Sequence, residues 1–279
     1  DDLAELLIKH PDARIVAGGT DLALEVTQFH RTINTLIHVA GVTEMKSVKV
    51  TDSNIEIGAA CSLTDSYATL AHYFPDFGEL LYRFASLQVR NQGTLGGNIG
   101  NASPIGDAPP ALIALDAKVE LRSGSDVRVM DIEEYFIGYK ITAQKASEFI
   151  SKIIIPLPNS AQKFSAYKVS KRLDDDISAV LGAFSITVAN NKVTNVRLAF
   201  GGMAAIPVRA THAETSLLGA EWTYENVEKA MFALRNDFSP LSDFRASKEY
   251  RMLTAENLLK KFYLEQLNTD IETRVTSYV

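Results

Sequence analysis

The stretch from Ser86 to Asp107 holds the residues whose types and spacing best suit chemistry. Four glycines fall within eight residues and alternate with neutral hydrogen-bonding side chains: Gly93, Gly96, Gly97 and Gly100, with Thr94, Asn98, Asn101 and Ser103. Glycine permits positive φ and close approach, and Asn, Thr and Ser add donors and acceptors. Backbone N–H groups in such a stretch hold phosphate without many cations. The stretch therefore predicts a diphosphate-binding loop. The alternative is a glycine-rich turn, which the length and the mostly uncharged surroundings disfavour.

A second stretch, Arg14 to Asp21, has similar features near the start of the chain. The apolar run Ile15 to Ala17 predicts a buried strand, which leads directly into Gly18-Gly19-Thr20. Backbone amides at the end of such a strand are well placed to meet phosphate. Neither stretch fits G-x-G-x-x-G or the P-loop pattern, so both of these nucleotide motifs are disfavoured.

The composition is that of a globular protein. The 279 residues are 46% hydrophobic and 22% charged. This length is enough for a sizeable core and for two or three lobes. The net charge of −6 excludes a basic footprint for nucleic acid. No apolar run reaches the length of about 20 residues that a membrane helix needs. The chain starts at Asp1, without Met or a signal peptide, so we expect a fragment, a processed piece or a domain of something longer.

The sequence lacks the residues needed for disulfide, iron–sulfur, metal and serine hydrolase chemistry. The single cysteine, Cys61, excludes an internal disulfide and iron–sulfur ligation, fits a reducing cytoplasm and is expected to be a small buried hydrophobe. No metal site is expected, because no H-x-x-x-H or C-x-x-C grouping occurs among the histidines His10, His30, His38, His72 and His212. No G-x-S-x-G hydrolase elbow is present. We assign no catalytic acid or base.

Local patterns predict the elements that position the two glycine stretches. In the N-terminal part they indicate a helix over 3–10, a βαβ unit over 14–39 and a hairpin over 48–57. Ser62 and Asp65 form a capping-box signal for a helix to about residue 73, and a helix over 78–87 leads into the central stretch. Next come a helix over 108–115, a hairpin over 117–129 and a strand over 149–155.

The chain after the prolines Pro156 and Pro158 reads as a separate lobe. It opens on a strand from residue 164, followed by a charged segment over 168–176 that is expected to be mainly a solvated loop with local ion pairs. Strands over 180–188 and 193–200 form a hairpin, and the pair Gly201-Gly202 is expected to be structural. Amphipathic helices are expected over 223–238 and from 247 to about 264, with 275 as the outer limit. Three strands and two or three helices predict an α+β lobe.

The motifs RIVAGGTDL and QVRNQGTLGGNIGNASPIGDAPP together resemble the FAD-binding module of the molybdenum hydroxylase family. This family includes xanthine dehydrogenase, carbon monoxide dehydrogenase and 4-hydroxybenzoyl-CoA reductase. The resemblance runs along the whole chain and is closest to the small, FAD-containing subunit of xanthine dehydrogenase. The segment KVSKRLDDDI looks more like xanthine dehydrogenase than like carbon monoxide dehydrogenase.

The resemblance implies an α+β fold. Residues 1–160 would form a two-lobed FAD-binding domain of the PCMH or vanillyl-alcohol-oxidase type, with about 1–57 as the first lobe and 58–160 as the second. Residues 161–279 would form a C-terminal domain like that of the CO dehydrogenase flavoprotein, with a three-stranded antiparallel sheet and helices.

The resemblance also implies the function. In this family a molybdenum centre hydroxylates the substrate, and electrons pass through two 2Fe–2S clusters to FAD and, in the dehydrogenases, as a hydride to NAD⁺. This chain would perform only the flavin step. Its partners would be an iron–sulfur domain or subunit and a molybdenum-cofactor subunit, in the cytoplasm.

The family pattern gives candidate FAD contacts. The diphosphate would lie against Ala17, Gly18, Gly19 and Thr20, with Arg14, Ile15, Val16 and Asp21 completing that segment. The ribityl and phosphate oxygens would be held by Thr94, Gly97, Asn98 and Asn101. Phe84 and Ile150 would wall the rings and Asp107 would reach a polar part of the cofactor, although spacing alone favours core packing for Phe84. Lys168 would stabilise the anionic reduced ring. Asp175 would belong to the loop that, in the xanthine dehydrogenase relatives, lies over the flavin and affects NAD⁺ access.

Two other functions stay open. One is a flavoprotein subunit of the carbon monoxide dehydrogenase or hydroxybenzoyl-CoA reductase type, with quinone, oxygen or ferredoxin in place of NAD⁺. The other is a nucleotide-binding module without redox function that serves assembly or regulation. Visible absorption separates them, because only a bound flavin is coloured.

Overall fold

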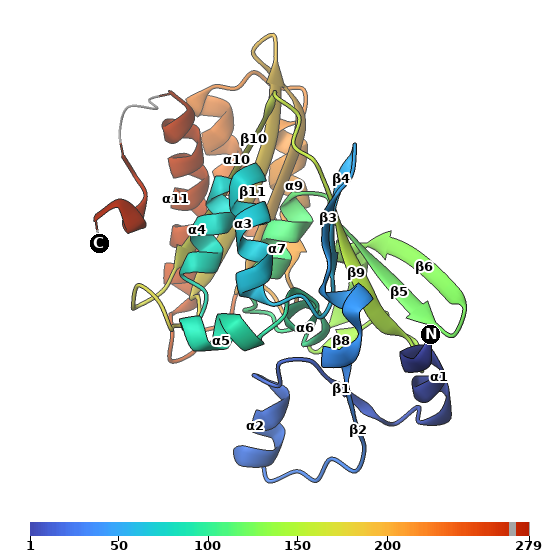
Figure 1. Ribbon diagram of the computed structural model, residues 1–279. Coiled ribbons are helices and arrows are strands. Elements are labelled where there is room, and N and C mark those ends of the chain that lie inside the picture. The colour runs from blue at the N-terminus through green and yellow to red at the C-terminus, as the bar shows by residue number, and fades with distance from the viewer. Residues whose placement is uncertain (268–271, 279) are drawn as a thin grey trace.

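A small lobe, a five-stranded sheet with its helices and a four-stranded sheet with its helices follow one another along the chain (Figure 1). The computed structural model describes residues 1–267 and 272–278. The fold is mixed α+β, as the sequence predicts.

The small lobe projects from the rest of the molecule (Figure 1). Its elements are α1 (Asp2–Lys9), β1 (Arg14–Val16), α2 (Leu22–Thr27) and β2 (Leu36–His38), followed by the short 3-10 turns η1 (Val39–Gly41) and η2 (Thr43–Lys46). Strands β1 and β2 pair in parallel, which confirms the predicted βαβ unit.

The second part is built on an antiparallel sheet in the order β3-β4-β9-β5-β6. Its strands are β3 (Val48–Val50), β4 (Asn54–Gly58), β5 (Lys118–Ser123), β6 (Asp126–Asp131) and β9 (Phe149–Pro156). The hairpin β3–β4 was expected in the first lobe, up to residue 57, but β4 pairs with β9 and therefore lies in this sheet. Strand periodicity reveals a strand but not a partner that lies far away in the sequence.

Short helices surround this sheet. They are α3 (Leu63–Tyr73), α4 (Pro75–Tyr82), α5 (Leu87–Gln92), α6 (Leu95–Gly100), α7 (Ala108–Ala114) and α8 (Ile132–Tyr135), with the small hairpin β7 (Phe136–Gly138) and β8 (Ile141–Thr142) after them. The hydroxyl of Ser62 accepts a hydrogen bond from the Asp65 N–H, so the predicted cap of α3 is confirmed.

The C-terminal part carries the sheet β10-β11-β12-β13. Its elements are β10 (Gln162–Val169), β11 (Val180–Ala189), β12 (Lys192–Gly201), β13 (Val208–Arg209), α9 (Thr211–Leu217), α10 (Tyr224–Asp237), α11 (Lys248–Leu267) and η3 (Val275–Tyr278). The expectation of three strands was wrong, because the two-residue edge strand β13 is too short to show an alternating pattern. The outer limit predicted for α11, residue 275, is reached only across residues 268–271, which lie outside the described residues.

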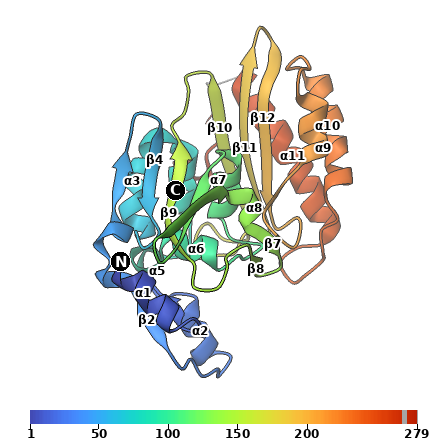
Figure 2. The same ribbon diagram turned by 90° about the vertical axis from the view of Figure 1, so that its right-hand side faces the viewer.

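Helices from both parts cover the four-stranded sheet. Helices α9, α10 and α11 lie on one side of it, and α7, from the preceding part of the chain, packs on β11 and β12 from the other (Figure 2). Leu181, Ala183 and Ala199 of this sheet accordingly belong to the same buried cluster as the core of the second part. One face of the four-stranded sheet therefore belongs to the core of the second part, whereas its other face forms a separate cluster with α9, α10 and α11.

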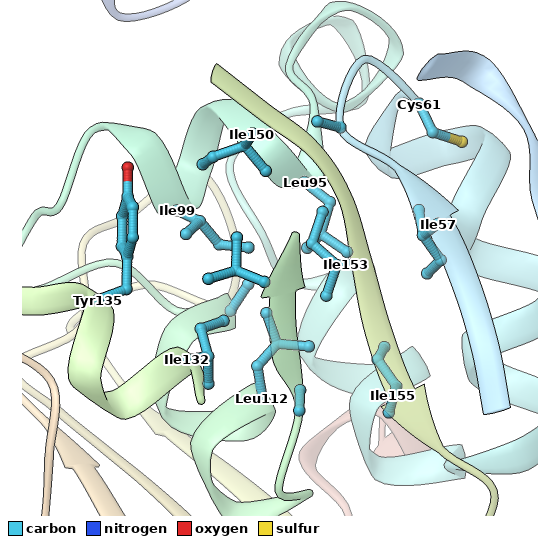
Figure 3. Close-up of a cluster of buried hydrophobic side chains, with 14 of the residues drawn as sticks. Ile57, Cys61, Leu95, Ile99, Leu112, Ile132, Tyr135, Ile150, Ile153 and Ile155 are labelled. Carbon is cyan, nitrogen blue, oxygen red and sulfur yellow. The ribbon is translucent and has the colours of Figure 1, made fainter. Parts of the chain in front are cut away.

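The glycine-rich stretch is anchored on this core through α6. Leu95 and Ile99 point from α6 into the cluster that also holds Ile150 and Ile153 of β9 (Figure 3). Both side chains are fully buried, and each contributes about 1.5–3 kcal/mol of transfer free energy. Burial of this apolar face therefore holds a helix that its glycines alone would disfavour.

Side chains suited to metal or thiol chemistry are not grouped. Within residues 1–267 and 272–278, no set of three or more His, Cys, Asp or Glu side chains is arranged to hold a metal ion. Cys61 is buried, and burial raises the pKa of its thiol. None of the described helices combines the length and apolar character needed to cross a membrane.

Candidate functional site

The two glycine stretches meet in space. A Cβ atom added at Gly18 would lie 1.7 Å from the carbonyl oxygen of Gln92 and 2.9 Å from the nitrogen of Gly93. The segment after β1 therefore runs backbone against backbone along the end of α5. Only glycine at position 18 permits this contact, which brings residues 17–21 of the small lobe against the start of the central stretch.

The segment after β1 presents backbone amides. The N–H groups of Gly18, Gly19 and Thr20 donate to no acceptor within the described part of the chain. Gly19 has φ +70°, a left-handed conformation that favours glycine. The side chain of Asp21 precedes α2 without capping it. Free amides at a tight turn form an anion-binding concavity, which fits a diphosphate.

Arg14, Ile15 and Val16 support this segment from β1. The Arg14 guanidinium forms a two-point ion pair with Glu25, with Nη1–Oε2 and Nη2–Oε1 distances of 3.1 and 2.8 Å. This pair ties α2 to β1 and fixes the turn between them. Ile15 and Val16 are half-buried and pack in the strand.

The central stretch forms two short helices, α5 and α6, with a turn between them, rather than the long loop expected from its glycines. Ser86 caps α5 by accepting from the Val89 N–H at 3.3 Å, and Thr94 caps α6 by accepting from the Gly97 N–H at 3.0 Å. A Cβ at Gly96 would lie 2.5 Å from the Cβ and carbonyl oxygen of Ala59. Gly96 therefore serves packing, and the buried Thr94 hydroxyl orders the turn.

The opposite face of α6 is open. Gly97 and Gly100 are exposed, and a Cβ at Gly97 would meet only the Thr94 hydroxyl, at 2.9 Å. The Asn98 Oδ1 atom is buried and accepts no hydrogen bond from the described residues. Asn101 is half-buried at the end of the helix. An open glycine face beside an unsatisfied amide oxygen fits a polar ligand such as the ribityl and phosphate part of FAD.

The two apolar residues expected beside the flavin rings both pack in the core, and Ile150 borders the open face of α6. Ile150 on β9 is 8% exposed, and its Cδ1 lies 3.6 Å from a Cβ built at Gly100. Phe84, after α4, is half-buried and packs against the core, which agrees with the packing role that its spacing favours. The Arg90 guanidinium donates to the carbonyl oxygens of Phe84 and Ala85 at 2.7 and 3.2 Å, which fixes the backbone there.

Asp107 and Lys168 form a buried ion pair between the two parts of the molecule. The Lys168 Nζ lies 2.5 Å from Asp107 Oδ2 and 2.8 Å from the carbonyl oxygen of Asp176. The other Asp107 oxygen, Oδ1, accepts from the Ser178 hydroxyl at 2.5 Å. Asp107 and Lys168 are 5% and 7% exposed, so the positive charge of Lys168 is already matched inside the protein.

The loop between β10 and β11, residues 170–179, is fastened to the segment after α4. The Asp175 N–H donates to the Ala85 carbonyl at 3.2 Å, and both residues have positive φ, +47° and +44°. The Arg83 guanidinium donates from Nε to Leu173 O and from Nη1 to Lys168 O, both at 3.0 Å. The Asp175 side chain is exposed.

The predicted site residues therefore fall into two groups. Residues 14–21 and 94–101 adjoin through the contact of Gly18 with the end of α5, and Phe84, Lys168 and Asp175 are linked through Arg83 and the loop. Sequence reasoning missed Arg83 and Ser178. No local signal marks either residue, because their roles depend on contacts with distant backbone and side-chain atoms.

Family models match both parts of the chain. The model described as the FAD binding domain in molybdopterin dehydrogenase matches residues 1–158, and the CO dehydrogenase flavoprotein C-terminal domain matches residues 165–266. The first range covers the small lobe together with the part that carries the five-stranded sheet, and the second range covers most of the part that carries the four-stranded sheet.

Relatives of known name are similar over nearly the whole chain. Xanthine dehydrogenase of Emericella nidulans is 31% identical over 98% of this chain, which spans 21% of that protein. The xanthine dehydrogenase FAD-binding subunit of Escherichia coli O157:H7 is 27% identical over 95% of this chain and 92% of the subunit. Among solved structures, a chain of carbon monoxide dehydrogenase from Hydrogenophaga pseudoflava superposes with a TM-score of 0.88 at 25% identity, covering 93% of this chain and 91% of that chain.

Proposed function

This chain belongs to the family of FAD binding domains in molybdopterin dehydrogenase, and we propose that it is the electron-transfer flavoprotein part of a xanthine dehydrogenase-like molybdenum hydroxylase. In this proposal it receives electrons from 2Fe–2S clusters on an iron–sulfur partner and delivers them to NAD⁺. A molybdenum-cofactor subunit is the second partner, and the enzyme works in the cytoplasm.

One observation carries the FAD-binding part of the proposal. The backbone contact of Gly18 with Gln92 joins a turn with free amides to the open glycine face of α6. The amides of residues 18–20 would hold the diphosphate, and Thr94, Gly97, Asn98 and Asn101 would hold the ribityl and remaining phosphate oxygens. Few cations are needed, because backbone dipoles supply the positive potential.

The flavin rings would lie between apolar and charged groups. Phe84 and Ile150 would exclude water from the rings, and the Asp107–Lys168 pair would border their polar edge. The Asp175 loop would cover the pocket and influence access of NAD⁺. Bound FAD supplies the redox chemistry, whereas these residues bind and orient it and set the electrostatic environment. No side chain is assigned as an essential acid or base.

The acceptor is tested with the FAD-loaded chain under anaerobic conditions. NADH should bleach the visible flavin absorption, because hydride transfer between NADH and a flavin is reversible in principle. A flavin that stays oxidised with NADH but is reduced by dithionite would favour the carbon monoxide dehydrogenase-like alternative with another acceptor. A folded chain that retains ADP but no FAD would favour the non-redox nucleotide module.

A further inference from the structure

A groove follows β10, the edge strand of the four-stranded sheet. It has a volume of about 830 Å³, and every residue of β10 contributes to its lining. Side chains of α4 and α11 form other parts of the lining. None of residues 14–21 and 94–101 lines this groove, so it is distinct from the two glycine stretches of the candidate flavin site.

The outer edge of β10 has unused backbone hydrogen-bonding groups. Along an antiparallel strand, the N–H and C=O of one residue point to one side and those of the next residue to the other. The Lys168 carbonyl accepts from the Arg83 guanidinium and so faces away from β11, and the backbone groups of Phe164 and Ala166 face the same way. Within residues 1–267 and 272–278, no backbone group pairs with Phe164 or Ala166 on this side. Such a row of unpaired groups is a template for a further strand.

Two carboxylates of α4 line the groove and share one guanidinium. Arg274 donates to both oxygens of Asp76, at 3.1 and 2.9 Å, and to Glu79 Oε2 at 2.8 Å. Burial raises the pKa of the Asp76 carboxyl even beside Arg274. In the part of the chain that the structure describes, Asp76 has no other ion pair. This turn of α4 is therefore a recognition site for a guanidinium.

The C-terminal residues 273–275 of the chain itself occupy this recognition site. Thr273 is held on α11, where Lys261 Nζ donates to its carbonyl oxygen at 3.1 Å and Glu265 accepts from its hydroxyl. Residues 273–275 therefore bridge α11 and α4 through side-chain contacts, whereas no backbone hydrogen bond among the described residues joins them to β10. They fill the guanidinium site and leave the strand edge unpaired.

We propose that the groove docks an extended segment of a partner subunit, which adds to β10 as a fifth strand and places an arginine on Asp76 and Glu79 in place of Arg274. Hydrogen bonds to the backbone of Phe164 and Ala166 supply affinity, as in other cases of strand addition. The carboxylates select a guanidinium, because it binds a carboxylate through two parallel hydrogen bonds. A neutral segment would leave Asp76 half-buried without a cation, which is unfavourable. Docking in this groove requires no bound FAD.

The test uses the full chain and a fluorescein-labelled peptide, acetyl-Thr-Val-Arg-Val-Thr-Val-amide, in fluorescence anisotropy titrations. Arg274→Gln should bind this peptide at least tenfold more tightly than wild type, because Arg274 competes for the same carboxylates at a high effective concentration. The same peptide with Gln in place of Arg should bind the Arg274→Gln chain at least tenfold more weakly. Of two peptides with N-methyl groups on alternate backbone nitrogens, only the one methylated on the side that faces β10 should lose binding.

Lys229→Gln is the matched control, because it removes an exposed charge on α10 outside the groove and should bind the peptide like wild type. Circular dichroism identifies a variant that is not folded, and the change of Arg to Gln in the peptide needs no change in the groove itself. Equal binding of the Arg and Gln peptides, equal binding of the two methylated peptides, or no binding by a folded Arg274→Gln chain would overturn the docking groove. Dimerisation of Arg274→Gln in place of peptide binding would assign the groove to a second copy and overturn the partner. Each of these outcomes is read without FAD, so none depends on the proposed function.

Discussion

At the scale of single residues, the glycines of the candidate site differ in what a side chain would meet. Gly18 and Gly96 touch backbone atoms of Gln92 and Ala59, so they serve close packing. Gly97 and Gly100 lie on the exposed face of α6, where a Cβ would meet only side-chain atoms, the Thr94 hydroxyl at 2.9 Å and the Ile150 Cδ1 at 3.6 Å. Composition alone cannot separate these roles, because it shows where glycines are and not what faces them.

Gly97→Val should weaken FAD binding while the fold persists. The new side chain would stand on the open face of α6 and press on the Thr94 hydroxyl, which lies 2.9 Å from the Cβ position. We expect at least a tenfold loss of affinity, about 1.4 kcal/mol, in a fluorescence titration with FAD. Gly41→Val is the matched control, since nothing lies within 4 Å of its Cβ position. Equal affinity of the two variants would remove α6 from the binding site.

The buried Asp107–Lys168 pair makes a second residue-scale prediction. Asp107→Asn leaves the Lys168 ammonium buried without a carboxylate and should destabilise the FAD-free chain by about 3–5 kcal/mol in urea unfolding. The double variant Asp107→Asn/Lys168→Met should lose less than this.

The control for the buried pair is the exposed pair of Lys118 and Asp131. Lys118→Met should change stability by no more than about 0.5 kcal/mol, because solvent screens that pair. An Asp107→Asn variant as stable as Lys118→Met would show that the buried pair does not hold the two parts together.

At the scale of elements, strands and long helices were predictable from the sequence, whereas short helices and distant pairings were not. The hairpins β5–β6 and β11–β12 carry clear alternation and a turn between their strands. Helices α5 and α6 have six residues each, and in α6 three of them are glycine, so neither shows a helical period and both were expected to be loop. Pairing of β4 with β9 depends on the assembled core and leaves no local mark.

The ion pair of Arg128 with Glu148, just before β9, makes the stability of the protein depend on pH. Arg128 on β6 binds both oxygens of the buried Glu148, at 2.7 and 2.8 Å, and this hydrogen-bonded pair lowers the pKa of Glu148. The stabilisation by ionised Glu148 is therefore fully present above the pKa that Glu148 has in the unfolded chain, about 4.3. It is lost as the pH falls through the lower pKa that Glu148 has in the folded protein.

Glu148→Gln tests this contribution directly. The variant should be less stable than wild type by about 1–2 kcal/mol at pH 7, a value reduced because Arg128 is partly exposed. Urea unfolding at a series of pH values should show the difference shrinking below about pH 4.5. If the difference in unfolding free energy between wild type and Glu148→Gln stayed constant from pH 7 to pH 3, the charge of Glu148 would contribute nothing to stability.

At the scale of the whole molecule, the candidate site draws on all three parts of the chain. The small lobe contributes residues 17–20, the second part contributes α6, Phe84 and Ile150, and the C-terminal part contributes Lys168 and Asp175. Helix α7 packs on β11 and β12, so the last two parts are joined by a shared core. The small lobe joins the same core through Leu3, Ala4 and Leu7 of α1, and its segment 17–20 meets α5 through the Gly18 contact. This contact is therefore the most direct place to test the candidate site by mutation.

The most direct test of the account is a titration of the purified full chain with FAD, followed by flavin fluorescence and visible absorption, for wild type and Gly18→Ala. The added methyl group cannot fit 1.7 Å from the Gln92 oxygen, so the small lobe must move away from α5. We predict equimolar binding by wild type and by the control Gly41→Ala, and at least tenfold weaker binding by Gly18→Ala with its circular dichroism preserved. Binding by Gly18→Ala as tight as wild type, or no binding by a folded wild-type chain, would contradict the account.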